Sequence, residues 1–404
     1  MRDIGNAKSS RQNEGIYAQL LQGPEALSTL GKHWDDLFQR SVDAPPYLSR
    51  AWISTFINEG RLRGIPLFVV VWTSGKLVAL LAIAVRCFLG MKIAEPIGTG
   101  EPSYLGVLSD PDHPSAIQCM ADFIARESSI KALCFRNLSS TDRATNKLID
   151  ELHQRRFLYR CAERNLCPLI QLACSYDEYL ETTKSSKQRK KLRKEERKLT
   201  KYGKVKLFRY RASEISPKIL SRIATIQEES WMKRRGAAVL GQSFYQKLLF
   251  EMAKAGFGNV WLMTLDDEDA AFKYTLIAHR RLYLHWTAFK LKYASSVSVG
   301  KVLTLMAIRD ACNDGILSAD LGHGDVEHKR FWATDFHEVS RASVGCGFTG
   351  RLVVFGFAFI WWVAKHQWLR ARYRVLRRKL LIAGARLSSK CRIAFDLGIG
   401  FRQR

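Results

Sequence analysis

The stretch that decides the fold is residues 260–321, which read VWLMTLDDEDAAFKYTLIAHRRLYLHWTAFKLKYASSVSVGKVLTLMAIRDACNDGILSADL. Short apolar runs separated by turn residues predict strands, and the longer apolar stretch that ends at Asp314-Gly315 predicts a helix. Three strands, a helix and a returning strand predict a mixed α+β unit. The predicted elements are strands at 260–265, 270–278, 282–289 and 317–321, and a helix at 299–312.

The same order of elements occurs earlier in the chain. A buried hairpin is predicted around the Ser74-Gly75 turn, followed by a helix and a strand. Short helices are expected before it around Trp34 and Trp52, separated by Pro45-Pro46, which cannot continue a helix. The repeat predicts two copies of one α+β unit. The earlier elements are strands at 67–73 and 76–86, a helix at 114–126 and a strand at 132–138.

Length and composition are those of a globular protein with an unusual charge. The 404 residues correspond to two or three domains, and 47% apolar with 25% charged residues exclude a disordered or collagen-like chain. The net charge of +26 is concentrated in two segments. Residues 184–206 hold twelve basic and two acidic side chains, and residues 365–404 hold twelve basic and one acidic. The rest of the chain is nearly neutral.

The first basic segment predicts a helix over 185–206 with a thin apolar seam of Leu192, Leu199 and Tyr202. The second follows an uncharged run at 352–364, which as a helix spans only about 20 Å, too short for a bilayer core of roughly 30 Å. Apolar residues continue among the basic ones and predict an amphipathic basic helix. It either contacts an anionic membrane surface or packs back on the protein with its basic face exposed. The continuing residues are Leu369, Tyr373, Leu376 and Leu380.

Cysteine usage and the first residues favour the cytoplasm. Nine cysteines are scattered without a CxxC pair, which predicts reduced thiols rather than a disulfide framework or a thiolate zinc site. Residues 1–8 lack the apolar core of a secretory signal. We therefore expect a cytoplasmic protein, with possible peripheral contact with the inner face of the membrane through 351–404.

The segment from Tyr293 to Lys301 is the first candidate for chemistry. A strand leads into a run of small residues, and the free N–H groups at the start of the next helix suit a pyrophosphate. Neither the P-loop nor the GxGxxG spacing is present. The alternative interpretation is that Ser298 simply caps the helix.

The second candidate is the segment from Asp320 to Trp332. Gly322 and Gly324 allow a sharp turn just past a strand, near the carboxyl end of the sheet where α/β proteins hold ligands. Its aspartates and histidines do not match the spacing of a known metal motif, so no metal site is predicted.

The third candidate is the segment 228–236, at the end of a helix predicted to begin near Ser216. Trp231 in it either packs in a core or recognises a ligand. His285, on the strand 282–289, is either a hydrogen-bonded core histidine or an imidazole that lines a cleft. The sequence leaves both pairs of alternatives open.

Several short motifs occur in a distinctive order and spacing between residues 180 and 335. They are Lys187-x-Arg189 to Arg193-Lys194, Glu229-Ser230-Trp231 with Gly236, Phe244-Tyr245, Tyr283, Tyr293, Ser298-x-Gly300, Asp320-x-Gly322-x-Gly324-Asp325 and Lys329-x-x-Trp332. Together they resemble the acetyltransferase domain of CelD-type GNAT proteins, a family associated with bacterial cellulose and exopolysaccharide synthesis. The basic helix also resembles the corresponding stretch of the Fem-type relatives.

The resemblance implies two tandem GNAT-like halves, the second of which binds acetyl-CoA or another acyl-CoA as co-substrate. It implies an N-terminal half at 1–175, a basic helical linker at 176–212, an acyltransferase half at 213–350 and a basic amphipathic tail at 351–404. It also implies roles for particular side chains. Glu229, Asp320 and His285 are the candidate proton acceptors, Ser298, Val299, Gly300 and Lys301 hold the pyrophosphate, and Ser230, Trp231, Lys329 and Trp332 shape the acceptor side.

The expected function is transfer of an acyl group from acyl-CoA to the amine of an amino sugar or of an envelope or exopolysaccharide precursor. A Fem-type transferase that takes an aminoacyl group from tRNA is one alternative, with the basic helix gripping RNA phosphates. A non-catalytic, membrane-associated accessory protein of polysaccharide synthesis is another. Nucleic acid is an expected partner only in the tRNA alternative.

Overall fold

The computed structural model describes residues 15–365 except 63, 89–90, 102–103, 128, 173–174 and 295–297. The amphipathic continuation predicted at 369–380 lies outside the described residues, as does part of the predicted pyrophosphate loop. The chain divides into two compact units. Unit 1 contains residues up to Arg164 and from Val339 onward, and unit 2 contains Asn165–Glu338. The chain passes between them within β7 (Leu158–Gln171) and β13 (Asp335–Gly345).

The sheet of unit 1 is mixed and has the strand order β1-β2-β3-β4-β6-β13, with β5 paired to β3. Only the β4–β6 pair among them is parallel. The hairpin predicted around Ser74-Gly75 is confirmed, and both of its strands are buried because helices cover the two faces of the sheet. The strands are β1 (Tyr17–Gln22), β2 (Ile65–Thr73), β3 (Lys76–Phe88), β4 (Met91–Pro96), β5 (Leu108–Ser109) and β6 (Ala132–Ser139).

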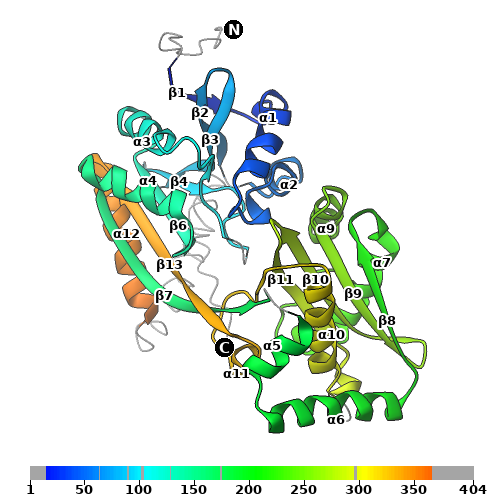
Figure 1. Ribbon diagram of the computed structural model, residues 1–404. Coiled ribbons are helices and arrows are strands. Elements are labelled where there is room, and N and C mark those ends of the chain that lie inside the picture. Colours follow the sequence, from blue (N-terminus) through cyan, green and yellow to red (C-terminus); the bar gives the residue numbers. More distant parts are fainter. Residues whose placement is uncertain are drawn as a thin grey trace, which may run out of the picture. The chain divides into compact units, whose positions relative to one another are not determined.

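Helices cover both faces of this sheet (Figure 1). On one face, Trp34 packs edge-on against Phe68 of β2, with ring centroids 5.8 Å apart. On the other face, Val69 and Val71 join a core with residues of α3 and α4. The helices predicted around Trp34 and Trp52 are confirmed, with Pro45 just before the short 3-10 helix that separates them. The helices are α1 (Ala26–Arg40), η1 (Pro46–Leu48), α2 (Arg50–Asn58), α3 (Ala116–Arg126) and α4 (Arg143–Gln154).

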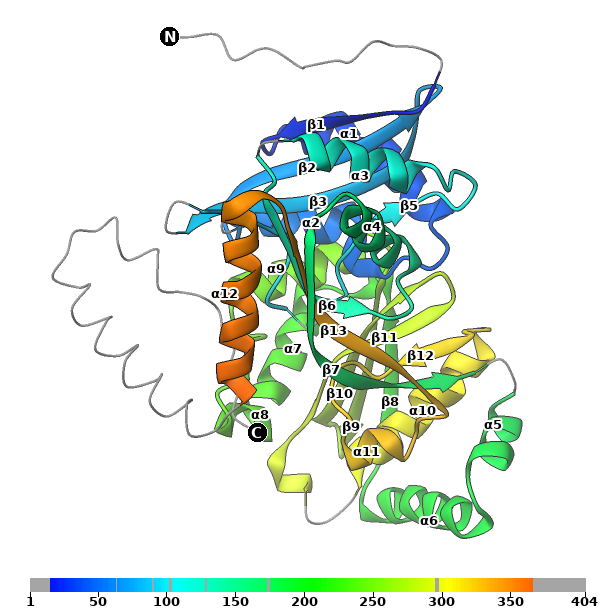
Figure 2. The ribbon, with the colours of Figure 1, turned by 90° about the vertical axis from the view of Figure 1, so that its left-hand side faces the viewer.

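Helix α12 (Gly347–Lys365), the orange helix of Figure 2, also belongs to unit 1. Its two faces differ in burial. Val353 and Phe357 are buried in a small core with residues of β4 and β6. The helix begins close to the sheet, because a Cβ on Gly350 would lie 2.2 Å from the carbonyl oxygen of Lys131. Its other face carries exposed apolar side chains at Phe348, Leu352, Phe355, Phe359 and Trp362. Among the described helices, none has the length and apolar character needed to cross a bilayer.

The sheet of unit 2 has the order β7-β12-β11-β10-β9-β8, and its β11–β12 pair is parallel while the other pairs are antiparallel. All four strands predicted in the opening stretch are present. Asp266 and Asp267 form the two-residue turn between β9 and β10 with φ values of 52° and 62°. The strands are β8 (Val205–Arg211), β9 (Gly258–Leu265), β10 (Glu268–Ala278), β11 (Arg281–Phe289) and β12 (Ser318–Asp320).

Helix α10 (Val299–Asn313), also predicted, covers one face of this sheet in a core that includes Trp261 and Met263 of β9. The alternate residues of β9 and β10 point to the opposite face, where the Tyr274 hydroxyl donates to the carbonyl of Leu249 in α9 over 2.9 Å. The repeated order of hairpin, helix and strand is therefore present in both units. The other helices are α5 (Tyr176–Thr183), α6 (Ser186–Tyr202), η2 (Ala212–Glu214), α7 (Pro217–Glu228), α8 (Trp231–Arg234), α9 (Ser243–Lys254), η3 (Leu291–Tyr293) and α11 (Glu327–Arg330).

The segment 176–212, expected as a linker, is an integral part of unit 2. Strand β8 pairs along its whole length with β9, and α6 rests on α10 through buried Leu192 and Leu199. Ser185 begins α6 with a capping box in which its side chain and that of Gln188 bond each other's backbone amides. Tyr202, expected on the seam, is 48% exposed because α6 ends there.

Candidate functional site

The candidate site lies where β11 and β12 separate. Their parallel pairing covers three residues on each strand and ends at the pair Tyr283 and Asp320. Just beyond, the register between β10 and β11 shifts so that His285 has no partner position, which is a β-bulge. A bulge twists the strand locally and re-aims its backbone and side chains. The carboxyl ends of these parallel strands thus form the place where such sheets bind ligands.

The loop after β12 is held in a tight turn. Gly322 and Gly324 have φ values of +72° and +96°, which confirms the predicted sharp turn, since side chains disfavour this region. The backbone N–H of Gly322 donates to a carboxylate oxygen of Asp320 over 2.7 Å. Lys329 closes the loop, because its Nζ donates to the carbonyls of Gly322 and His323 over 3.1 and 2.6 Å.

Asp320 forms a buried pair with His337 of β13. The Nε2 of His337 lies 2.9 Å from Oδ2 of Asp320, and the side chains are 8% and 5% exposed. A carboxylate in this setting holds the imidazole in one orientation. His337 was not predicted from the sequence, and no local motif connects two residues separated by 17 positions.

Two further histidines lie in the same region, and both are neutral at pH 7. Burial lowers the pKa of His285, whose ring centroid is 3.8 Å from that of Trp286, to about 3. Burial also lowers the pKa of His323 to about 4, and its Nδ1 lies 3.7 Å from Sγ of buried Cys167. An imidazole with so low a pKa is a weak proton acceptor at neutral pH. Cys167 is a second residue that the sequence did not single out.

We expect the stability of the protein to fall between about pH 6.5 and pH 4. The folded-state pKa of His285 and His323 lies below the unfolded value, so the unfolded chain binds more protons as the pH falls. Each histidine can contribute a slope of up to about 1.4 kcal/mol per pH unit. Chemical denaturation at pH 7, 6 and 5 measures it, and His323→Gln should make the slope shallower. An unchanged slope in that variant would contradict the assignment.

The first turn of α10 is the predicted pyrophosphate site. Ser298 occupies the N-cap position, as the alternative interpretation expects, but its side chain makes no capping hydrogen bond. Val299 is buried, and a Cβ on Gly300 would lie 3.2 Å from the ring of Phe289 at the end of β11. The Lys301 ammonium lies 5.2 Å from the ring centroid of Phe331. The start of a long helix with a lysine in its first turn favours an anion.

Glu229, Ser230 and Trp231 lie at the far end of β11. Glu229, half exposed, forms an ion pair of 2.9 Å with Lys290, and Ser230 bridges to the backbone of the same lysine. Lys290 is seven residues beyond Tyr283, which is about 23 Å along an extended chain. The structure therefore does not bring Glu229 beside Asp320.

The remaining predicted residues divide between surface and core. Trp231 is 37% exposed, and the Arg235 guanidinium lies 5.2 Å from its ring centroid. The Ser230 hydroxyl is buried and donates to the Gln227 carbonyl over 2.7 Å. Trp332 is buried in the core beneath α10, and its carbonyl accepts from the Tyr179 hydroxyl over 2.8 Å. Lys329 is thus the residue of the predicted acceptor group that lies next to Asp320.

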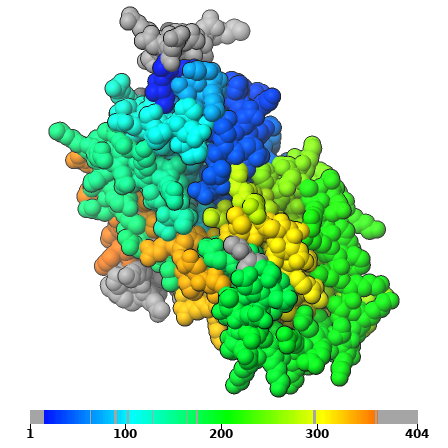
Figure 3. Space-filling view, in the orientation of Figure 1, coloured from blue at the N-terminus to red at the C-terminus, as the bar shows by residue number. Residues whose placement is uncertain are grey.

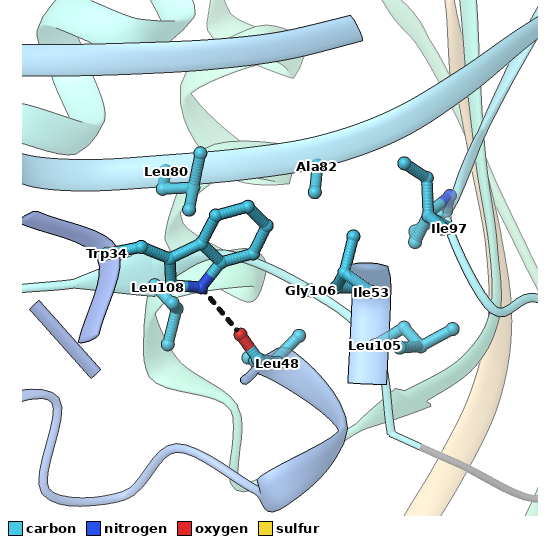
Figure 4. Close-up of a pocket in the computed structure, with 10 residues that line it drawn as sticks. Trp34, Leu48, Ile53, Leu80, Ala82, Ile97, Leu105, Gly106 and Leu108 are labelled. Atoms are coloured by element: carbon cyan, nitrogen blue, oxygen red, sulfur yellow. Dashed lines mark hydrogen bonds between the residues drawn. The ribbon is translucent and has the colours of Figure 1, made fainter. Parts of the chain in front are cut away.

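Unit 1 has a cavity of a different kind (Figure 4). Trp34 projects into it, and its Nε1 donates to the carbonyl of Leu48 over 3.0 Å. The other lining residues are apolar or glycine, so this cavity lacks groups for acid–base chemistry. Over the described residues of both units, no group of three or more His, Cys, Asp or Glu side chains is placed to hold a metal ion.

Residues 186–330 match the family described as the acetyltransferase (GNAT) domain, and no curated protein matches the chain. The fold resembles that of FemX, with 11% identity, a TM-score of 0.57, and coverage of 76% of this chain and 95% of FemX.

It also resembles the C-terminal domain (DUF2156) of a protein from Agrobacterium fabrum assigned as a lysylphosphatidylglycerol synthetase. The identity is 12%, the TM-score 0.52, and the coverage 81% of this chain and 95% of that domain. At these identities the likeness concerns the fold alone, and it confirms the predicted mixed α+β, tandem-GNAT-like architecture. The match of residues 186–330 to the acetyltransferase (GNAT) domain points to an acyltransferase.

Proposed function

We propose that the chain is an acyl-CoA-dependent N-acyltransferase that acts on an amino sugar or on an envelope or exopolysaccharide precursor. One observation carries the proposal. In the GNAT domain, β11 and β12 part at a β-bulge, directly beside the buried Asp320–His337 pair and the loop held by Lys329. The acceptor class rests on the CelD-type resemblance of the motifs between Glu229 and Trp332.

The chain's own residues supply what the reaction needs. Bound acyl-CoA would supply the thioester carbonyl that the acceptor amine attacks. Ser298, Val299, Gly300 and Lys301 would hold its pyrophosphate at the start of α10. Backbone N–H groups at the bulge around His285 would stabilise the oxyanion.

Asp320 is the proton acceptor that we favour among the three candidates. It is buried at the end of β12, and its partner His337 can share the proton that the amine loses. His285 is the weaker base because its pKa is about 3, and Glu229 is held by Lys290 at the other end of β11. Lys329 would position the acceptor loop, while Ser230, Trp231 and Trp332 would shape its surroundings.

Binding of the donor is tested by thermal unfolding of the full chain with acetyl-CoA and with free CoA. We expect both ligands to raise the melting temperature, since they bind the folded state only. Lys301→Glu should abolish the shift, because it reverses a charge in the first turn of α10. Lys254→Glu, the same change on the exposed last turn of α9, should keep it. If CoA compounds leave the wild-type melting temperature unchanged, the proposal fails.

A Fem-type, tRNA-dependent transferase is the second candidate, and α6 is the observation that favours it. Eight lysine and arginine side chains of this helix are exposed, on the surface that α5 and α6 form at the bottom of Figure 3. The same experiment with aminoacyl-tRNA distinguishes the two candidates. Protection by aminoacyl-tRNA, lost in the triple variant Lys190→Glu, Lys194→Glu, Lys198→Glu, would favour RNA as the donor.

We also propose that the protein lies peripherally on an anionic membrane surface. The exposed face of α12 places five apolar side chains along one line, at spacings of three and four residues. The helix leads into a strongly basic segment, with twelve basic and one acidic residue in 365–404. Rings at an interface and cations near anionic headgroups both favour binding. A protein that binds vesicles but no acyl donor would be the accessory protein of the third alternative.

A further inference from the structure

A small cavity lies between the sheet of unit 2 and α10. About 30 Å³ of it is open to the centre of a water molecule, which is room for two or three waters. Most of the surrounding side chains are aliphatic, and the exceptions are a lysine and two threonines. The lining residues are Ile170 and Leu172 of β7 and the segment after it, Lys273 and Thr275 of β10, Leu282 and Leu284 of β11, Thr304, Ala307, Ile308 and Ala311 of α10, and Ala319 and Leu321 at β12.

Lys273 is the unusual member of this lining. It lies opposite Trp261 in the β9–β10 register, on the face that α10 covers, and is 6% exposed. No hydrogen bond or ion pair joins it to another residue that the structure describes, and the described lining residues include no carboxylate. A buried ammonium without a counter-charge is costly, so a group of this kind is a candidate for function.

Lys329 adds a second positive charge near the cavity. Burial and, to a smaller extent, the charge of Lys329 lower the pKa of Lys273 to about 8. Lys329 is itself occupied by the carbonyls of the Gly322 loop. An anion that entered the cavity would therefore find Lys273 as its counter-charge and would favour the charged ammonium.

The cavity meets the candidate site at the parting of the strands. Tyr283 and Asp320 form the last pair of β11 and β12, and the next residues along, Leu284 and Leu321, both line the cavity. An acyl group that reacts between the separated ends of β11 and β12 would therefore lie next to the cavity, on the side of the sheet that α10 covers. The size of the cavity suits a carboxylate rather than a long hydrocarbon chain.

We propose that this cavity is the acyl pocket of the transferase and that it takes a short acyl group ending in a carboxylate, which pairs with Lys273. The donor is then the CoA monothioester of a short dicarboxylic acid such as succinate. This inference rests on the proposed function, since it specifies the donor of the same site. The threonine hydroxyls of the lining already donate to backbone carbonyls, Thr304 to Gly300 over 2.8 Å and Thr275 to Asn259 over 3.4 Å, so Lys273 is the cation of the lining that an anion would meet.

The test compares succinyl-CoA with acetyl-CoA on the full chain, by kcat/KM with an amino-sugar acceptor and by thermal shift. We expect the wild-type protein to prefer succinyl-CoA by about 10- to 100-fold, the range of one charged hydrogen bond. Lys273→Met keeps an unbranched side chain of nearly the same length and removes the charge, so the preference should disappear. Lys254→Met, on the exposed end of α9, is the matched control and should keep it.

The outcomes separate the two proposals. If neither thioester shifts the melting temperature or reacts, the proposed function itself fails. If acetyl-CoA binds and reacts as well as succinyl-CoA in the wild-type protein, the function stands and the acyl pocket is rejected. An equal preference in wild-type and Lys273→Met proteins also rejects it, because a purely structural lysine changes stability and leaves the ratio of donors alone. The comparison of succinyl-CoA with acetyl-CoA on the wild-type protein tests the acyl pocket even if the Lys273→Met variant does not fold.

Discussion

Asp320→Asn is expected to lower kcat for acyl transfer by about 100- to 1,000-fold, the range for loss of a general base. The substitution keeps the shape of the side chain, so the acceptor for the Gly322 amide remains. It removes the negative charge beside His337 and the oxygen that accepts the proton of the attacking amine. Steady-state rates with saturating donor measure the effect.

The control is Asp177→Asn, which makes the same change on the exposed first turn of α5 and should leave the rate unaltered. A purely structural role for Asp320 is excluded by the pH profile. As a base, it should give the wild-type rate an acid limb that Asp320→Asn lacks, while both proteins unfold at similar temperatures. A rate within threefold of wild type for Asp320→Asn would remove this residue from the reaction.

Replacing Phe355 and Phe359 by Ser is expected to weaken binding to anionic vesicles by about 10- to 100-fold. Both side chains are more than half exposed, and each loses about 1 kcal/mol or more of interfacial burial when its ring is removed. Co-sedimentation with phosphatidylcholine vesicles containing 30% phosphatidylglycerol, at low and high salt, measures the partition coefficient.

The matched control replaces Val42 and Ile65 by Ser, which removes two exposed apolar side chains elsewhere in unit 1. It should bind vesicles like the wild type. Equal pelleting of all three proteins would show that the α12 face does not contact lipid. If the exposed apolar face of α12 instead joined two copies of the chain, the Phe355→Ser, Phe359→Ser variant would elute as a smaller particle in gel filtration. Its binding to vesicles would be unchanged.

Local patterns were enough to predict most elements of the fold. The hairpin at Ser74-Gly75, the strands of unit 2 and α10 follow from runs of apolar residues and from turn residues between them. The sharp turn at Gly322 also follows, because a positive φ is cheap only for glycine. These features depend on neighbours within about ten residues, where periodicity and turn chemistry act.

Local patterns gave incomplete expectations where contacts between distant parts of the chain determine the structure. Helical spacing placed Tyr202 on a buried seam, but α6 ends at that residue and the side chain is 48% exposed. Ser298 has the type and position of a helix cap, yet its side chain makes no capping bond. The basic segment 176–212, expected to be a linker, contains β8, and the strand that pairs with β8, β9, lies about 50 residues later in the chain.

The amino-acid sequence by itself determined the two repeated α+β units, the basic helix, the apolar aromatic helix before the tail, and the glycine turn that carries Asp320. The tertiary structure alone decided that Asp320 meets His337, that Cys167 meets His323, and that Lys273 faces a cavity beneath α10. It also decided which side of α12 is left exposed. The physical reason is that burial and charge pairing depend on strands and helices far apart in the chain, whereas turns and amphipathic periods are properties of adjacent residues.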